Sequence, residues 1–244
     1  MSRKSKRNQP DPVSPPSQAQ SAPAAKRWSR RNIFIASVAA LLLAFVSATL
    51  LYRSEQARSS QFAAAKNLPA LASERSPTFG PADAKVHLVE FFDPACETCA
   101  AFFPHVKRLL SANPDRIRLS VRHVPFHNGS DEVVRMLEAA RNQDRYLPVL
   151  EALYASQNQW VRNHQVQADL AWMSLAGLGL DLDRLRREMN APEVARRMAQ
   201  DMSDARILGV TKTPEFFVNG RPLPRFGLEE LQTLVQEELR RAYP

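Results

Sequence analysis

The sequence predicts a mixed α/β domain that follows one membrane-spanning helix near the N-terminus. The α/β assignment rests on residues 86–92, an apolar run typical of a buried strand, which leads through a short turn into a helical pattern. The membrane helix is indicated by residues 33–52, a run of twenty residues without a charged side chain. Between the second strand and the last strands, about 130–208 shows helical patterns only, so the domain carries a large helical region.

The first part of the chain is strongly basic. Residues 1–32 contain eight lysines and arginines against one acid, so they carry +7 of the chain's net charge of +8. The remainder is close to neutral, which argues against nucleic acid as a partner. Residues 8–25 are rich in Pro, Ser, Gln and Ala, so residues 1–32 are predicted to be a disordered cytoplasmic tail.

The uncharged run at 33–52 is long enough to cross a bilayer, because twenty helical residues extend for about 30 Å. The basic flank should stay in the cytoplasm. We therefore expect a single-pass protein of the inner (cell) membrane whose C-terminal domain lies outside the cytoplasm, in the bacterial periplasm or an equivalent space. A cleaved signal peptide is the alternative, with small residues at Val46 to Ala48. The length of the run favours an uncleaved anchor.

Residues 53–76 are polar, with many Ala and Ser, and lack the pattern of a folded core. They are predicted to be a linker, helical in part, between the membrane and a domain at 77–244. No internal repeat is present in the chain.

Cys96 and Cys99 are the two cysteines of the chain, and they lie three positions apart at the start of the predicted helix. Such a pair can close into a disulfide and reopen, and no third cysteine exists for a structural bridge. Free backbone N–H groups at a helix N-terminus stabilise a thiolate, which is the form that attacks a disulfide. Cys96 is therefore the expected nucleophile, and Cys99, one turn further into the helix, the resolving thiol.

The rest of the domain is assigned by periodicity. Residues 117–124 alternate as a strand, and Ser130 is placed to begin a helix whose apolar stripe includes Val133, Leu137 and Ala140. The last helix, about 228–241, is expected to bury Leu231, Leu234 and Val235.

Two further features complete a family pattern. Thr213-Pro214 opens a strand that ends at the hairpin signal Asn219-Gly220, and Glu90 stands six residues before Cys96. With the two cysteines, these features resemble membrane-anchored, DsbA-like thiol:disulfide oxidoreductases. The resemblance covers about 77–244, and it implies a thioredoxin fold with a helical insertion at about 130–208.

The resemblance also implies roles for individual residues. Cys96–Cys99 would be the redox disulfide, and Thr213-Pro214 the cis-proline dipeptide that lies against it, binds the substrate strand and prevents metal capture. Glu90 would be a buried acid beneath Cys99 that accepts its proton. No cofactor and no metal are implied. The implied partners are substrate proteins with thiols or disulfides and a redox partner in the membrane.

The residues between the cysteines depart from DsbA, which has proline and histidine there. Glu97 places a negative charge beside the nucleophile, and Thr98 offers only a neutral hydrogen bond. Both changes predict a disulfide that is less oxidising than that of DsbA. Thr213 replaces the valine of DsbA and resembles the isomerases and some reductases. The direction of electron flow is therefore left open.

Two other functions use the same cysteines. The pair could bind copper, or zinc with His105 as an added ligand, although a structural zinc site needs four ligands. The chain could also be a non-catalytic, membrane-tethered adaptor. His87 and His123 lie in predicted strands as packing residues, and His127 lies in a loop that could face the active site.

Overall fold

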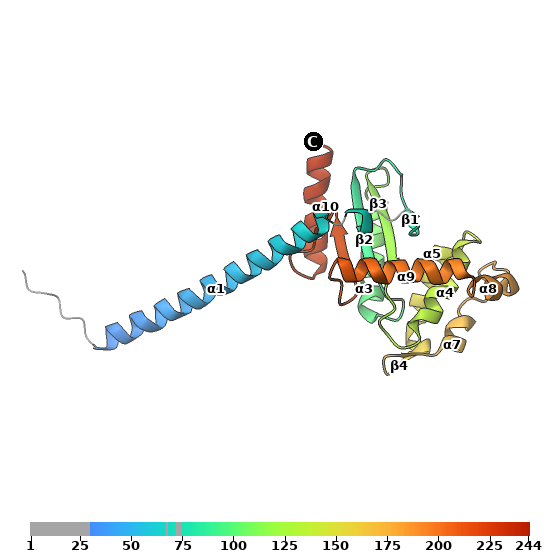
Figure 1. Ribbon diagram of the computed structural model, residues 1–244, viewed down its shortest axis with the longest axis horizontal. Helices are drawn as coiled ribbons and strands as arrows, with labels where there is room; N and C mark the ends of the chain where they lie inside the picture. Colours follow the sequence, from blue (N-terminus) through green and yellow to red (C-terminus); the bar gives the residue numbers. More distant parts are fainter. Residues whose placement is uncertain (1–29, 67, 72–74) are drawn as a thin grey trace, which may run out of the picture. The chain divides into compact units, whose positions relative to one another are not determined.

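The structure is a computed structural model that describes residues 30–66, 68–71 and 75–244 (Figure 1). Most of the basic tail predicted at 1–32 lies outside the described residues. Along the chain the elements are α1 (Arg30–Lys66), α2 (Leu68–Leu71), β1 (Thr78–Phe79), β2 (Val86–Phe92), α3 (Glu97–Ser111), β3 (Ile117–His123), α4 (Ser130–Arg141), α5 (Tyr146–Ala155), α6 (Gln157–Trp160), β4 (Val161–Arg162), β5 (Gln165–Val166), α7 (Ala168–Met173), α8 (Leu182–Glu188), α9 (Pro192–Ile207), β6 (Glu215–Val218), β7 (Arg221–Pro222) and α10 (Leu228–Ala242).

The N-terminal helix α1 contains the stretch Ser37–Glu55. Among the described residues, this is the one helical stretch that is long and apolar enough to cross a membrane by length and composition. Large apolar side chains along it, such as Leu41, Phe45 and Leu51, are exposed. The stretch overlaps the predicted membrane helix at 33–52, so the predicted N-terminal apolar helix is confirmed.

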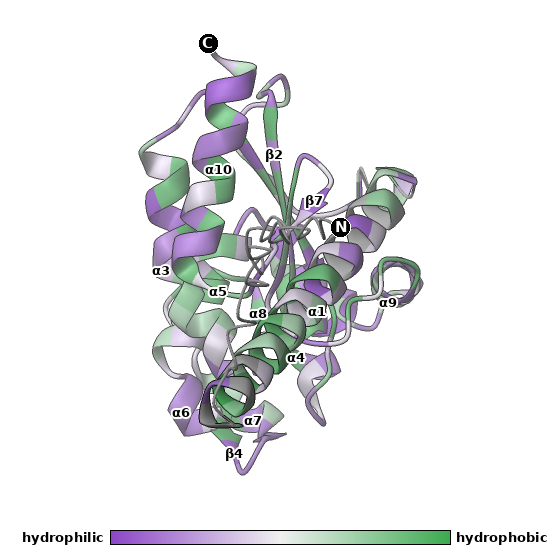
Figure 2. Cartoon of the chain, turned by 90° about the vertical axis from the view of Figure 1, so that its left-hand side faces the viewer, coloured by the Kyte–Doolittle hydropathy of each residue, from purple (hydrophilic) through white to green (hydrophobic). Residues whose placement is uncertain are grey.

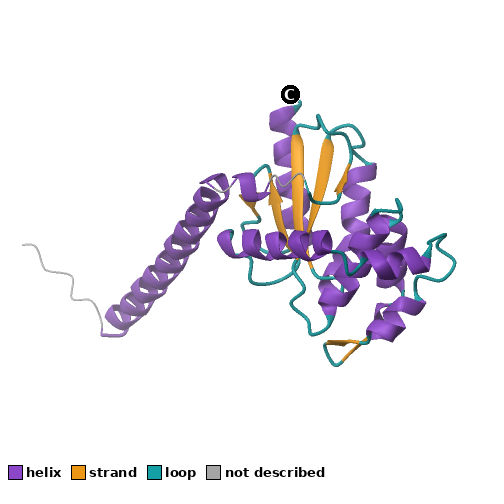
Figure 3. Cartoon of the chain, turned by 45° about the vertical axis from the view of Figure 1, so that its right-hand side comes forward, coloured by secondary structure: helices purple, strands orange, loops and turns teal. Residues whose placement is uncertain are grey.

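The domain is built on a five-stranded mixed sheet with the order β1-β3-β2-β6-β7 (Figure 3). The central strand β2 pairs in parallel with β3, and Glu90 lies opposite Val121. On its other side β2 pairs antiparallel with β6, which brings Phe216 opposite Glu90. The predicted strand at 86–92 and the predicted hairpin at Asn219-Gly220 are both confirmed. The parallel pair and the hairpin together give a thioredoxin-like sheet.

The two faces of β2 carry different cores, because successive side chains of a strand point to opposite sides. Leu88 and Phe92 pack with the apolar residues of α3 and α10, whereas Val89 and Phe91 pack with those at the end of α9. Figure 2 shows α3 and α10 on one side of the sheet and α9 on the other. Glu90 shares the parity of Leu88 and Phe92, so it points toward α3, the helix that begins at the cysteines.

The insertion between β3 and β6 is largely helical, as predicted. The expected stripe on α4 is confirmed, since Val133, Leu137 and Ala140 are fully buried. The expectation of helices alone was wrong in one place, where β4 and β5 form a two-stranded hairpin. Its turn residues Asn163 and His164 both adopt positive φ angles, of 52° and 59°. Two-residue turns of this kind usually contain a glycine, and this turn has none, so no hairpin signal was present in the sequence.

A buried ion-pair cluster joins the sheet to α9 and α2. The Arg122 guanidinium on β3 is fully buried and donates to Asp201 at 2.6 Å, to Asp204 and to the backbone carbonyl of Ala70. Ala70 and the adjacent Leu71 fall within the interval predicted as linker, yet both are buried, and Leu71 packs in the same cluster as Val89. The helix α2 has only four residues, which is too short for a periodic apolar pattern, so this packing could not be predicted from the sequence.

The Arg122 cluster gives the first testable prediction. Arg122→Leu leaves two buried carboxylates without their cation, so we expect it to lower the free energy of unfolding by about 3–5 kcal/mol. Arg225→Leu is the matched control, because Arg225 pairs with Glu230 at the exposed surface and should cost less than about 1 kcal/mol. Urea denaturation of both variants measures the difference. Equal losses in the two variants would contradict a structural role for the cluster.

Candidate active site

Cys96 is the N-cap residue of α3, with an extended backbone at φ −77° and ψ 117°. Both cysteines are free thiols, and Cys99 is completely buried whereas Cys96 retains slight exposure. The Cys99 backbone N–H donates to the Cys96 sulfur at 3.3 Å. In its protonated form, the Cys96 thiol donates to the carbonyl of Thr213 at 3.4 Å. The geometry therefore places the first cysteine at the free N–H groups of a helix start, with its sulfur facing the loop before β6.

The two thiols differ sharply in acidity. Hydrogen bonding from the Cys99 side chain is the largest influence that lowers the pKa of Cys96, to about 6, against the opposing effect of its burial. Hydrogen bonds from the Thr213 side chain and from the backbone of Cys99 and Thr98 contribute to the same lowering of the pKa. Burial raises the pKa of Cys99, and the neighbouring Cys96 adds to that rise. At neutral pH the site accordingly holds a thiolate at Cys96 and a protonated thiol at Cys99.

Thr213 and Pro214 lie beside this pair. The peptide bond between them is cis, Pro214 is buried, and β6 begins at the next residue. Because β6 pairs with β2, the strand that leads to the cysteines, two segments separated by more than a hundred residues meet at one edge of the sheet. The predicted dipeptide and the predicted cysteines are therefore brought together.

Glu90 lies in the core on the α3 side of β2. Burial and, to a smaller extent, the charge of Cys96 together raise the pKa of its carboxyl group to about 8. The side chain lines a cavity of about 70 Å³ together with apolar residues, Tyr154, Lys107 and Glu151. A cavity of this volume has room for water beside a polar group. The structure thus places a buried carboxyl group with a raised pKa within electrostatic range of both thiols.

Asp93, in the turn after β2, is a residue of the site that was not predicted from the sequence. Its carboxylate is fully buried and accepts from the N–H groups of Ala95, Phe126 and His127, at 2.8–2.9 Å. It also accepts from His127 Nδ1 at 2.7 Å and from the Ser130 hydroxyl. Asp93 thus joins the cysteine loop to the loop after β3 and to the first residue of α4. An aspartate directly before a proline at a strand end was the available signal.

Gln157 is a second residue that the sequence did not reveal. It is buried at the start of α6, and its side-chain amide donates to the carbonyls of Pro94 and Cys96, at 2.8 and 3.2 Å. The cysteine loop is therefore joined to the helical insertion by two contacts. One runs from Asp93 in the loop to Ser130 of α4, and the other from Gln157 of α6 to the backbone of the loop. A glutamine within a helical pattern gives no indication in the sequence that its side chain bonds to a distant loop.

The other residues singled out from the sequence lie around this centre. Glu97 and Thr98 are exposed to solvent, which screens the charge of Glu97. His123 is buried against Tyr146, in keeping with the packing role expected for it. The ring nitrogen Nδ1 of His105 bonds to Arg108. In the described part of the chain, no three His, Cys, Asp or Glu side chains come together as metal ligands.

Known proteins resemble the domain over most of its length. A family model described as thioredoxin matches residues 72–237. A thioredoxin-like oxidoreductase from Silicibacter pomeroyi DSS-3 is 31% identical, with a TM-score of 0.61 over 71% of this chain and 97% of that one. The thiol-disulfide exchange protein alpha-DsbA2 from Wolbachia pipientis shares the fold, with a TM-score of 0.64 at 18% identity over 75% of this chain and 97% of its own.

A curated relative matches the chain over a shorter range. The Na(+)/H(+) antiporter NhaA of Herminiimonas arsenicoxydans is 35% identical over 144 residues, which are 59% of this chain and 22% of the antiporter. The chain therefore spans about a fifth of the length of the curated relatives that it matches. The similarity concerns a segment of the antiporter.

The acidity of Cys96 can be tested by alkylation. We expect iodoacetamide to modify the reduced protein at one thiol, with a half-maximal rate near pH 6. Cys99→Ala removes the largest stabilising hydrogen bond and should raise this midpoint. Cys99→Ser keeps a donor at the same place and should move it less. A midpoint near that of a free cysteine in the reduced wild type, about 8.5, would contradict the assigned geometry.

The buried carboxyl group predicts a pH dependence of stability. Glu90 is raised from 4.5 in the unfolded chain to about 8 in the reduced protein, so between these values the unfolded state loses a proton that the folded state keeps. The wild type should therefore lose stability relative to Glu90→Gln as pH rises from about 4.5 to 8, with little further change above. Denaturation of the reduced proteins across this range provides the comparison, and parallel curves would show that Glu90 is ionised in the fold.

Proposed function

The chain belongs to the thioredoxin family, and from that premise we propose that it is a membrane-anchored, extracytoplasmic enzyme that exchanges disulfides with substrate proteins through Cys96 and Cys99. The contrast between the two thiols is the observation that carries this proposal. One thiol is partly accessible and has a pKa of about 6, whereas the other is buried and has a raised pKa. Such a pair suits a nucleophile and a resolving thiol in sequence.

The first step joins enzyme and substrate. The Cys96 thiolate attacks one sulfur of a substrate disulfide, the substrate's S–S bond breaks, and its other sulfur leaves as a thiolate that takes up a proton. The product is a mixed disulfide between Cys96 and the substrate. Because Cys96 is a thiolate near neutral pH, this attack needs no separate base.

The second step releases the substrate. Cys99 loses its proton and attacks the Cys96 sulfur, the mixed disulfide breaks, and the second substrate sulfur leaves as a thiolate. Two electrons have then passed from the cysteine pair to the substrate, and Cys96–Cys99 is a disulfide. The same two steps in reverse oxidise a substrate dithiol.

Glu90 supports the second step as the proton acceptor for Cys99. The Cys99 thiol is completely buried, so its proton needs an acceptor inside the domain. A carboxyl group with a pKa of about 8 is partly ionised near neutral pH, and the cavity beside it gives room for water. This arrangement supports Glu90 as a shuttle between the thiol and solvent.

Thr213 and Pro214 are proposed to hold the substrate. The Thr213 carbonyl lies 3.4 Å from the Cys96 sulfur, and a proline cannot donate a backbone hydrogen bond. An extended substrate segment can pair with the backbone beside Thr213 and so bring its own sulfur to Cys96. The exposed Phe126 and Phe226 offer apolar contact surface on the same domain.

The topology of the chain is proposed from α1 and the charges before it. The basic residues at 1–32 favour a cytoplasmic N-terminus, which puts the cysteine domain in the periplasm. That compartment permits disulfides. Anchoring keeps the domain close to a membrane-embedded redox partner that restores the starting state of the cysteine pair.

The mechanism predicts different defects for three variants in an insulin-reduction assay. Cys96→Ala should abolish turnover, because no mixed disulfide can form. Cys99→Ala should trap substrate as a mixed disulfide that is visible on a non-reducing gel. Glu90→Gln should allow the mixed disulfide to form but slow its resolution by about 100-fold or more, as expected for loss of a proton acceptor.

A control variant and two outcomes decide whether this mechanism holds. Glu97→Gln changes an exposed carboxylate of the same loop and should leave resolution near the wild-type rate. Turnover in Cys96→Ala would contradict the proposed enzyme and favour the adaptor function. Equal resolution rates in Glu90→Gln and the wild type would remove Glu90 from the mechanism.

A further inference from the structure

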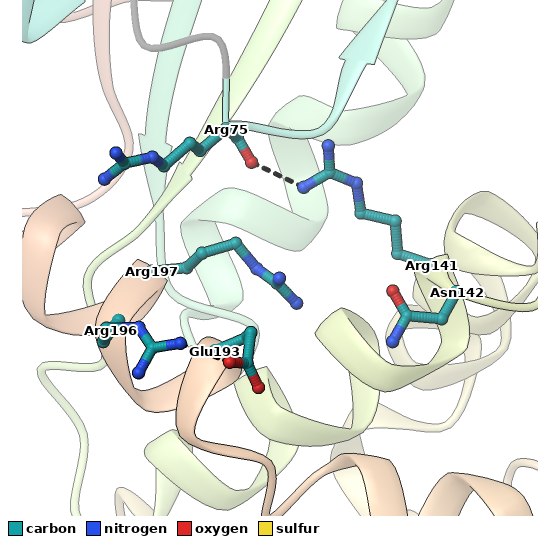
Figure 4. A pocket seen from close by; sticks show the side chains of 6 residues that line it. All are labelled: Arg75, Arg141, Asn142, Glu193, Arg196 and Arg197. Carbon is teal, nitrogen blue, oxygen red and sulfur yellow. Dashed lines mark hydrogen bonds and ion pairs between the residues drawn. The ribbon is translucent and has the colours of Figure 1, made fainter.

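A cleft rich in arginine lies away from the cysteines. It encloses about 600 Å³ and is lined by residues from the start of the domain, the end of α4 and the beginning of α9, namely Arg75, Arg141, Asn142, Glu193, Arg196 and Arg197 (Figure 4). Four arginines and one glutamate give this lining a net charge of +3. None of the proposed catalytic residues is part of it.

The arginines are only partly neutralised within the protein. Arg197 donates from Nε to the buried Glu138 at 2.5 Å, and Arg141 shares the same carboxylate at 3.9 Å. Arg141 also donates to the backbone carbonyl of Arg75, whose own guanidinium makes no ion pair with any described residue. Arg196 pairs with Glu193 at the exposed surface. Positive charge therefore remains in the cleft after these contacts.

One guanidinium nitrogen points to a missing acceptor. Arg197 Nη2 is buried and has no hydrogen-bond partner among the described residues. Buried donors are nearly always satisfied in folded proteins, so an unpaired one is informative. Figure 4 shows the Arg197 guanidinium extending into the middle of the cleft, with Arg141 on one side and Glu193 and Arg196 on the other.

The cleft and the redox centre lie at opposite ends of α4. The first residue of α4, Ser130, bonds to Asp93 beside the cysteine loop, whereas Arg141 is the last residue of this helix. Twelve helical residues separate the two ends by about 16 Å. The first turns of α9 likewise line the cleft, while its far end leads toward Thr213. An occupant of the cleft would leave the cysteine pair open to substrate.

We propose that this cleft binds a phosphate group. A phosphate offers several acceptor oxygens, and planar guanidinium groups bind such oxygens in pairs. The unpaired Arg197 Nη2 supplies a donor in the middle of the cleft, Arg75 adds a further positive charge to the lining, and Asn142 adds a neutral amide. Phosphate of this kind can come from a lipid headgroup or from a soluble phosphate compound.

Binding is tested on the full chain in dodecyl maltoside micelles by isothermal titration calorimetry. The probes are pyrophosphate and dihexanoyl phosphatidylglycerol, with dihexanoyl phosphatidylcholine as the zwitterionic comparison. Saturable binding of pyrophosphate alone would identify a soluble phosphate compound as the source. Stronger binding of the phosphatidylglycerol than of both other probes would identify an anionic lipid headgroup.

Variants separate the cleft from general charge effects. Arg75→Ala with Arg196→Ala removes two exposed lining arginines and spares the half-buried Arg197 and its buried partner Glu138, so the fold should be retained. Binding should weaken by at least about tenfold, because hydrogen bonds to charged groups are strong. Arg206→Ala is the matched control, since it removes one exposed arginine from the other end of α9 and should leave the affinity unchanged.

Two results would overturn the proposal. One is the absence of saturable binding of pyrophosphate and of phosphatidylglycerol to the wild type. The other is a loss of affinity in Arg206→Ala as large as that in the double variant, which would indicate attraction by net charge alone. Insulin reduction by the double variant should match the wild type, so the failure of this proposal is distinguishable from failure of the enzymatic one.

Discussion

The hydrogen bonding of the Cys96 sulfur at the start of α3 is the interaction on which the function of this fold depends. It keeps one thiol ionised near neutral pH while the other, three residues away, stays protonated in the core. Burial alone would raise the pKa of both thiols. The sheet, α3 and the loop before β6 are arranged so that more donors reach the outer sulfur than the buried one, and this asymmetry makes an ordered exchange possible.

The position of that sulfur is controlled from several parts of the chain. Asp93 links the cysteine loop to the loop after β3 and to α4, and Gln157 links it to α6. Thr213 approaches from the loop before β6. The helical insertion is therefore more than an addition to the sheet, because two of these three contacts start from it or reach into it. Its helices α4 and α9 also extend away from the redox centre and form the arginine-lined cleft at their far ends.

Much of this arrangement could be predicted because its main elements depend on residues that are close together in the sequence. The strand at 86–92, the helix start at Cys96 and the turn at Asn219-Gly220 each follow from periodicity or turn chemistry. The contacts of Asp93 and Gln157 could not be predicted, since each depends on partners that only tertiary folding brings near. The hairpin at β4–β5 was missed because its turn contains no glycine. Sequence patterns therefore located the reacting sulfurs better than the residues that position them.

The reduction potential of the Cys96–Cys99 pair tests the central claim most directly. It is measured by equilibrating the full chain with glutathione buffers and quantifying the reduced fraction. A Cys96 pKa of about 6 lies between the thiolates of thioredoxin and DsbA, so the account predicts a potential between about −270 and −120 mV. A value at or below about −270 mV would contradict it, because the Cys96 thiolate would then lack the stabilisation that the geometry assigns to it.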